Sequence, residues 1–517
     1  MQNKEHERGI MSYPNAVRAT VDAITDKSGP WDAVIYISPS AKSATSSAIT
    51  DAIAAFAEID KRVGLQPTLV PADGVAGGRI IFSPAGNLMR YFDDVRRYGD
   101  AAHKAAAIAK EAGAVNPLLV VETPADGRFQ NALEVSYLQV CQSLWQPLEA
   151  RESLDENEIE PVSQVGLVSN DVDVDWLNAT EAGRRLARDL CGTNPERMAP
   201  PGFADYCVEA FTGTDVKVDV ISSQEQLQNE YPLLAAVARA AVQVERHHAR
   251  VVTLTYEPEG EVTQSLYLAG KGVTYDTGGA DLKTGGFMAG MSRDKGGAAA
   301  VAGLMKTVAM LKPKGIKVVA ELGLVRNSIG SDAFVSDEII TSRAGVRVRI
   351  GNTDAEGRLV LSDVLTHLNE MAAGDSNAEF FSVATLTGHA ARAVGPYTAL
   401  VENGFARANK SAQALSDMGD LWGDPAEISR SRREDFAFVS ARTKADDVLS
   451  SNNAASAVTA RGHQFPMAFL CISSGLDKTN VPFTHVDIAG SGVERGDWQH
   501  GKPTAAPVTM LAARYFK

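Results

Sequence analysis

Carboxylate and basic side chains gather in two short segments of the second half of the chain. The first is GKGVTYDTGGADLKTGGFMAGMSRDKGGAAA, residues 270–300, and the second is NTDAEGR, residues 352–358. Each directly follows a strand-like run, SLYLAG in one case and VRVRI in the other. Because ligands bind beyond the carboxyl ends of strands in open α/β sheets, we expect the two segments to meet at one site.

Together the segments supply four carboxylates and three basic groups, which are Asp276, Asp294, Asp354 and Glu356, and Lys271, Lys283 and Arg358. Any one of these carboxylates, taken alone, is typical of a helix cap or a surface ion pair. Four that converge could not all ionise without compensating cations. Two divalent ions carry the matching charge, so the pattern indicates a dinuclear metal site. Asp354 and Glu356 are two residues apart, which in an extended segment places both on one face.

A calcium loop is the alternative interpretation of the second segment. Asn352, Asp354, Glu356 and Gly357, with Asp363 at the twelfth position, partly match an EF-hand loop. The first and last positions depart from that motif, and VRVRI before the loop has a strand pattern where an EF-hand has a helix. The sequence contains no Walker loop, HExxH helix or GxSxG elbow.

The elements that position these segments are those of an α/β protein. Strand-like and helix-like runs alternate between residues 31 and 122 and again from residue 251, which predicts mostly parallel sheets flanked by helices. The length of 517 residues fits more than one domain. We expect a smaller N-terminal α/β domain over 1–165, a linker helix region over 166–190, and a larger catalytic α/β domain over 191–517 with a mixed, mostly parallel sheet.

Charge and composition exclude several classes of function. Lys+Arg total 50 and Asp+Glu total 64, so the net charge is −14 and nucleic acid is not expected as a partner. No run of 18 apolar residues and no secretory leader are evident, so no membrane association is expected. The four cysteines form no CxxC pair and are expected to be buried thiols of a reducing, cytoplasmic compartment.

The motifs, taken in order, resemble those of the leucyl (cytosol) aminopeptidases, a family of dizinc exopeptidases. NTDAEGR is the hallmark, and the others are GKGVTYDTGG, the later Lys283, Asp294-x-Gly-Gly, ATLTG at 384–388 and HVDIAG at 485–490. The resemblance runs from about Ala187 to the C-terminus, and it is greatest to the aminopeptidase-like 1 branch of probable aminopeptidases. The first 150 or so residues share only the α/β character.

The resemblance implies a role for each matching residue. Asp276 and Glu356 would bridge two metal ions, Lys271 and Asp294 would complete the tighter site, and Asp354 would complete the more exchangeable one. Lys283 and Arg358 match the two catalytic basic residues, and the arginine would hold a bicarbonate. The residues that match substrate contacts are Met291, Thr385, Leu386 and Gly388.

We therefore expect a metal-dependent aminopeptidase that hydrolyses the N-terminal residue of peptides with a metal-bridging water. The resemblance implies a preference for leucine or other apolar residues, two divalent ions with Zn or Mn expected, and a homohexamer built as a dimer of trimers. The alternative is a non-catalytic binding or regulatory protein on the same scaffold.

Three residues depart from the pattern of the family. Asp281 stands in a stretch that is commonly apolar or small, Lys295 replaces a common Met, and Arg349 precedes the hallmark where Glu is frequent. Asp281 adds a negative charge near the site, so we expect it to disfavour acidic substrates.

Overall fold

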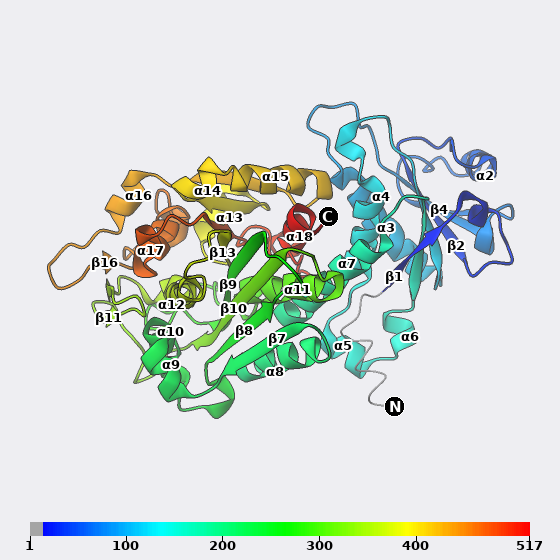
Figure 1. Ribbon diagram of the computed structural model, residues 1–517. Helices are drawn as coiled ribbons and strands as arrows, with labels where there is room; N and C mark the ends of the chain where they lie inside the picture. The colour runs from blue at the N-terminus through cyan, green and yellow to red at the C-terminus, as the bar shows by residue number, and fades with distance from the viewer. Residues whose placement is uncertain (1–13) are drawn as a thin grey trace. The chain divides into compact units, whose positions relative to one another are not determined.

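The structure is a computed structural model that describes residues 14–517, and the chain in it divides into two compact units. One comprises the residues up to Arg185 together with Asp417–Asp424. The other comprises Leu186–Ser416 and Pro425–Lys517. Both units are α/β, which confirms the predicted fold class (Figure 1).

The first unit contains a six-stranded sheet in the order β1-β6-β5-β2-β4-β3. All its strand pairs are parallel except β3 with β4. The residues of β2 are buried along its whole length, as expected for an inner strand covered on both faces. The strands are β1 (Asn15–Ala19), β2 (Ala33–Ser38), β3 (Thr68–Pro71), β4 (Arg79–Pro84), β5 (Pro117–Val121) and β6 (Gln164–Val168), and the helices are α2 (Ser47–Ala57), α3 (Arg96–Glu111), α4 (Ala132–Leu144), α5 (Leu148–Ser153) and α6 (Glu156–Ile159).

Helix α7 (Val174–Gly192) leads into the second unit, which is built on an eight-stranded mixed sheet in the order β15-β14-β17-β13-β9-β10-β8-β7. The central strands β17, β13, β9 and β10 are parallel, so their carboxyl ends lie at one edge. The strands are β7 (Val216–Ile221), β8 (Arg250–Tyr256), β9 (Gln264–Asp276), β10 (Ile316–Asn327), β13 (Ala378–Ala384), β14 (Thr398–Glu402), β15 (Ala426–Arg430) and β17 (Phe483–Asp487). A smaller sheet joins β11 (Ile339–Thr341), β12 (Arg347–Arg349) and β16 (Val448–Leu449).

Two long helices cover opposite faces of this sheet, α11 (Gly296–Leu311) and α12 (Glu356–Met371) (Figure 1). Their placement follows from neighbouring residues of β9, which point to opposite faces. A Cβ at Gly270 would lie 2.7 Å from the Cα of Ala298 on α11, whereas the side chain of Lys271 runs beside Gly357 on α12. The remaining helices are α8 (Pro200–Phe211), α9 (Gln224–Glu230), α10 (Pro232–Ala238), α13 (Gly388–Val394), α14 (Gly404–Ala408), α15 (Ser411–Trp422), α16 (Arg433–Phe438), α17 (Phe465–Ser473) and α18 (Val508–Phe516).

The segment that carries Asp354 and Glu356 is not extended, and that local prediction was wrong. Residues 353–355 form a single 3₁₀ turn, and α12 begins at Glu356 itself. The side chain of Asn352 caps the turn by accepting a hydrogen bond from the Asp354 amide at 2.7 Å, which favours helical geometry over a strand.

Between residues 14 and 517 we find no helix that combines the length and the apolar character needed to cross a membrane.

Candidate metal centre

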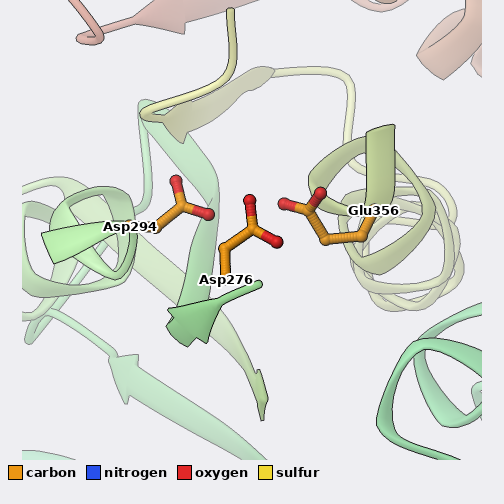
Figure 2. A group of neighbouring side chains, drawn as sticks. All are labelled: Asp276, Asp294 and Glu356. Carbon is orange, nitrogen blue, oxygen red and sulfur yellow. The ribbon is translucent and has the colours of Figure 1, made fainter. Parts of the chain in front are cut away.

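Three buried carboxylates converge at the carboxyl edge of the large sheet. Asp276 is the last residue of β9, Asp294 follows a 3₁₀ turn over Met291–Arg293, and Glu356 opens α12. One oxygen of each lies within 4.8 Å of the others. Figure 2 shows the three side chains pointing toward one another from separate elements. The structure therefore brings the two predicted segments together.

Two of these carboxylates stand at the amino ends of helices. Asp294 precedes α11 by two residues, and Glu356 is the first residue of α12. The unpaired amides of a helix N-terminus stabilise negative charge, by about 0.3–1 kcal/mol for an exposed group and more in a partly buried site. Both helix starts thus help to keep negative charge at the site.

Lys271 lies buried among these carboxylates. Its Nζ donates to Asp294 Oδ1 at 2.8 Å and to the carbonyl of Thr385 at 3.0 Å, and it lies 2.9 Å from Glu356 Oε1. Burial alone would lower the pKa of this amine, but the charges of Asp294 and Glu356 outweigh burial and hold the pKa above its ordinary value. The side chain fits because Gly357 has no Cβ, which would stand 2.7 Å from Nζ.

Lys283 connects two carboxylates on the outer side of the cluster. Its Nζ is 2.9 Å from Asp276 Oδ2 and forms a close ion pair with Asp354. Burial opposes its charge, but Asp276 and Asp354 together raise the pKa of Lys283 above its usual value. The structure thus places Asp354 beside the three converging carboxylates through a shared ammonium.

The cluster retains unsatisfied negative groups. Asp294 Oδ2 and Glu356 Oε2 are buried and have no hydrogen-bond partner. Burial and the charge of Asp276 raise the pKa of Asp354 to about 7, and burial raises that of Asp294 well above its usual range. Buried carboxylate oxygens without donors fit divalent cations, which take such oxygens as ligands.

Arg358 is buried in the first turn of α12, as its third residue. Its Nη1 donates to the Ser450 carbonyl at 2.8 Å, its guanidinium stacks over the ring of Phe465, and its Nε has no partner. Burial lowers the pKa of Arg358 to about 10. The residue therefore remains a cation with donor capacity to spare, which suits a small anion.

Comparison with known proteins decides the family. Residues 185–512 match the catalytic domain of the cytosol aminopeptidase family. The chain belongs to the cytosol aminopeptidase family. It is a hydrolase and a metal-dependent aminopeptidase, and membership confirms the resemblance to this family that was found in the sequence.

Several relatives share this family's sequence or fold. A Caenorhabditis elegans protein named "Putative aminopeptidase W07G4.4" is 42% identical over 455 residues, covering 86% of this chain and 87% of its own. A "Probable cytosol aminopeptidase" of Ehrlichia ruminantium is 31% identical over 308 residues, covering 59% of this chain and 57% of its own.

Two solved structures share the fold. The leucyl aminopeptidase of Trypanosoma cruzi superposes with a TM-score of 0.81 at 23% identity, covering 99% of each chain. The bottromycin maturation enzyme BotP, solved in complex with Mn, has a TM-score of 0.75 at 22% identity, covering 94% of this chain and 98% of its own.

The residues predicted to contact substrate lie on two segments of this aminopeptidase, the 3₁₀ turn before Asp294 and the stretch that leads from the end of β13 to the first residue of α13. Thr385 is at the cluster, because its hydroxyl donates to Asp294 Oδ1 at 2.7 Å. Met291 is on the turn that leads to Asp294, and its carbonyl accepts the Asp294 amide at 3.3 Å. Leu386 follows Thr385 directly, and the amide of Gly388 donates to Ser456 Oγ at 3.2 Å.

Two positioning residues escaped the sequence analysis. Asn327, the last residue of β10, donates from Nδ2 to Asp276 Oδ1 at 2.8 Å. Asp487, the last residue of β17, accepts from Thr387 Oγ1 at 2.7 Å and from the Leu386 amide at 3.2 Å. Both end strands at the edge that carries the site, and this position was the signal that could have revealed them.

The close contact of Gly357 with Lys271 gives a first prediction. Replacing a helical glycine with alanine ordinarily stabilises a helix by about 1 kcal/mol. Gly357→Ala should instead destabilise the protein by about 1–3 kcal/mol, because the new Cβ displaces a buried lysine held by three partners. Thermal unfolding would measure this change.

Gly404→Ala is the matched control, since Gly404 opens α14 and a Cβ there meets nothing within 4 Å. Equal melting temperatures for the two variants would contradict the prediction.

Proposed function

We propose that this aminopeptidase removes the N-terminal residue of peptides, preferring leucine or other apolar residues, at a site that holds two divalent ions. The observation that carries the proposal is the buried convergence of Asp276, Asp294 and Glu356, with Asp294 Oδ2 and Glu356 Oε2 lacking any donor. Metal-assisted hydrolysis of a peptide bond needs a pocket of fixed carboxylate ligands such as this one. The residues present fit a metal pair.

The ligand roles follow the family. Asp276 and Glu356 would be shared by both ions, Lys271 and Asp294 would complete the tighter site, and Asp354 would complete the more exchangeable site. The larger exposure of the Asp354 side chain, 35% against 8% for Asp294, supports that order.

Lys271 must lose a proton to act as an amine ligand, because an ammonium has no lone pair to donate. Its carboxylate neighbours favour the ammonium, so the charge of the ions would have to drive deprotonation. Metal binding should therefore release a proton from Nζ of Lys271.

The chain's own residues supply the rest of the chemistry. When bound, the ions polarise the scissile carbonyl and acidify water. Lys283, held as an ammonium by Asp276 and Asp354, would donate a hydrogen bond to the oxyanion that develops on that carbonyl. Arg358 would hold a bicarbonate through its unpartnered Nε, and the bound anion would supply general-base chemistry beside the ions.

Charge balance supports an anion at Arg358. Four carboxylates, two divalent ions, a neutral Lys271 and the cations Lys283 and Arg358 leave two positive charges in a buried space. Buried charge is costly unless it is paired, so an anion beside Arg358 would stabilise the loaded site.

The specificity of the proposed reaction has two sources. The free α-amine of a peptide can bind an ion, and an internal peptide bond offers no such amine. Met291, Thr385, Leu386 and Gly388 would line the site for the first side chain, and the apolar Met291 and Leu386 support a preference for leucine. Oxygen and amine ligands without a thiolate suit Zn or Mn.

We further propose a homohexamer built as a dimer of trimers, a cytoplasmic location and no nucleic-acid partner. The net charge of −14 supports the absence of nucleic-acid binding, and four buried thiols are typical of a reducing compartment.

Release of leucine from a Leu-led dipeptide tests the reaction. Metal-stripped protein should be inactive, and Mn²⁺ or Zn²⁺ should restore activity. The N-acetylated peptide should not be cleaved, because its amine is blocked. Asp354→Ala should lower kcat at least about 100-fold through loss of a proposed ligand, while Asp219→Ala on the exposed face of edge strand β7 serves as the control.

Cleavage of the acetylated peptide, or full activity without metal, would refute the exopeptidase mechanism. Faster turnover of Arg-led or Glu-led peptides would refute only the apolar preference.

Bicarbonate dependence tests Arg358 separately. Added bicarbonate should raise the kcat of the unmodified enzyme prepared in carbonate-free buffer. The kcat of Arg358→Ala should be about 100-fold lower, because the anion has lost its donor. Added bicarbonate should not change the kcat of this variant. An equal response of both proteins to bicarbonate would place the anion elsewhere.

Mass photometry tests the assembly. The hexamer predicts a particle of six times the 54.9 kDa chain mass. A single species at the chain mass would contradict it.

A further inference from the structure

Asp281 lies in the loop between two residues of the proposed centre, Asp276 and Lys283. The sequence suggests a charge that repels acidic substrates. In the structure the carboxylate also accepts a hydrogen bond from another segment, although the residue as a whole is exposed. Its partner is Thr353, which directly precedes Asp354.

The contact between Asp281 and Thr353 is reciprocal. The Thr353 amide donates to Asp281 Oδ2 at 2.7 Å, and the Asp281 amide donates to Thr353 Oγ1 at 2.8 Å. The same hydroxyl donates to the Gly278 carbonyl at 2.7 Å. Ser336 Oγ lies 3.4 Å from Asp281 Oδ2 and is the weakest of these contacts. Three short hydrogen bonds thus join residues 278–281 to a single threonine.

The two loops joined in this way carry separate parts of the centre. One runs from Asp276 to Lys283, and the other holds Asp354 and Glu356. Asn327 also connects them, because its Nδ2 lies 2.8 Å from Asp276 Oδ1 and 3.2 Å from the Thr353 carbonyl. Asn327 is fully buried, whereas Asp281 is at the surface. The loops are therefore joined inside the unit by Asn327, beside the cluster by the ion pair of Lys283 with Asp354, and at the surface by Asp281.

The contact between Asp281 and Thr353 affects the position of Asp354, because Thr353 and Asp354 are neighbours in the chain. Thr353 and Asp354 are consecutive in one short turn, so a shift of the Thr353 amide moves the Asp354 backbone with it. Glu356 and Asp294 are anchored differently, at the starts of α12 and α11. Loss of the Asp281 contact should act mainly on Asp354.

We propose that Asp281 is a positioning residue that fixes Asp354 relative to Asp276 and Lys283, and so sets the affinity of the more exchangeable metal site. The inference rests on the proposed function, since it takes the metal roles from there. Residues that orient metal ligands typically contribute 10–100-fold to affinity. The effect belongs to the hydrogen bonds of Asp281 and not to its negative charge.

Calorimetric titration of Mn²⁺ into the metal-stripped full chain tests this directly. The unmodified protein should show two binding events. Asp281→Ala should weaken the lower-affinity event about 10-fold and leave the tighter event unchanged. Asp281→Asn should restore most of that affinity, because its amide oxygen can still accept from the Thr353 amide while the charge is gone.

Two further measurements separate positioning from general damage and from charge. Hydrogen exchange of the Thr353 amide should accelerate in Asp281→Ala and stay near normal in Asp281→Asn. Melting temperatures should be unchanged, because Asp281 is exposed. Asp219→Ala removes the same charge from β7 and should change neither metal event.

Each contrary outcome has one meaning. Two normal metal events in Asp281→Ala would overturn the inference alone. Equal weakening in the Ala and Asn variants, with faster cleavage of Glu-led peptides, would overturn it in favour of charge repulsion. Failure of the unmodified protein to bind two ions would overturn the proposed function, and this inference with it.

Discussion

Mutual repulsion among buried carboxylates is the constraint on which the catalytic unit depends. Two charges 4.8 Å apart repel by about 3.5 kcal/mol at an effective dielectric constant of about 20, and three oxygens of the cluster lie within that distance of one another. Lys271 and Lys283 offset part of this repulsion, and the starts of α11 and α12 offset a further part. The remaining negative charge is what makes the pocket a cation site.

Repulsion among the carboxylates also explains why the elements around the site pack closely. A lysine can reach the cluster from β9 only if α12 approaches without a side chain, which is the place of Gly357. The three converging carboxylates come from different elements, Asp276 from β9, Asp294 from the turn before α11 and Glu356 from α12, so no single loop can move all three. Asn327 and Asp487, at the ends of parallel strands, tie the connecting loops to the sheet. Because these side chains are fixed by the sheet and the helix starts, the carboxylates stay close together in a buried site. On an open loop the same side chains would move apart into water.

The sequence predicted the site correctly where polar side chains directly follow apolar strand patterns. Buried apolar runs predicted the strands, and the polar residues after them predicted the site, because parallel strands end at one edge. Spacing alone failed for Asp354 and Glu356, since a capping asparagine turned an apparent extended segment into a helix start. The position of Asn327 at the end of a strand could have marked it as a candidate, but spacing alone did not show which side chain it contacts. Its role depends on the register of β10 against β9, which places it opposite Asp276.

The departures from the family pattern show a further limit of sequence reasoning. A charged residue near a site is easily interpreted as acting on substrate, yet each of the three has a partner within its own unit. Lys295 is fully buried and donates to the Thr193 carbonyl at 2.9 Å. Arg349 forms a close ion pair with Asp446, and Asp281 binds Thr353. Each of these contacts joins two segments of the catalytic unit, so all three departures have a structural role that the motif pattern alone did not indicate.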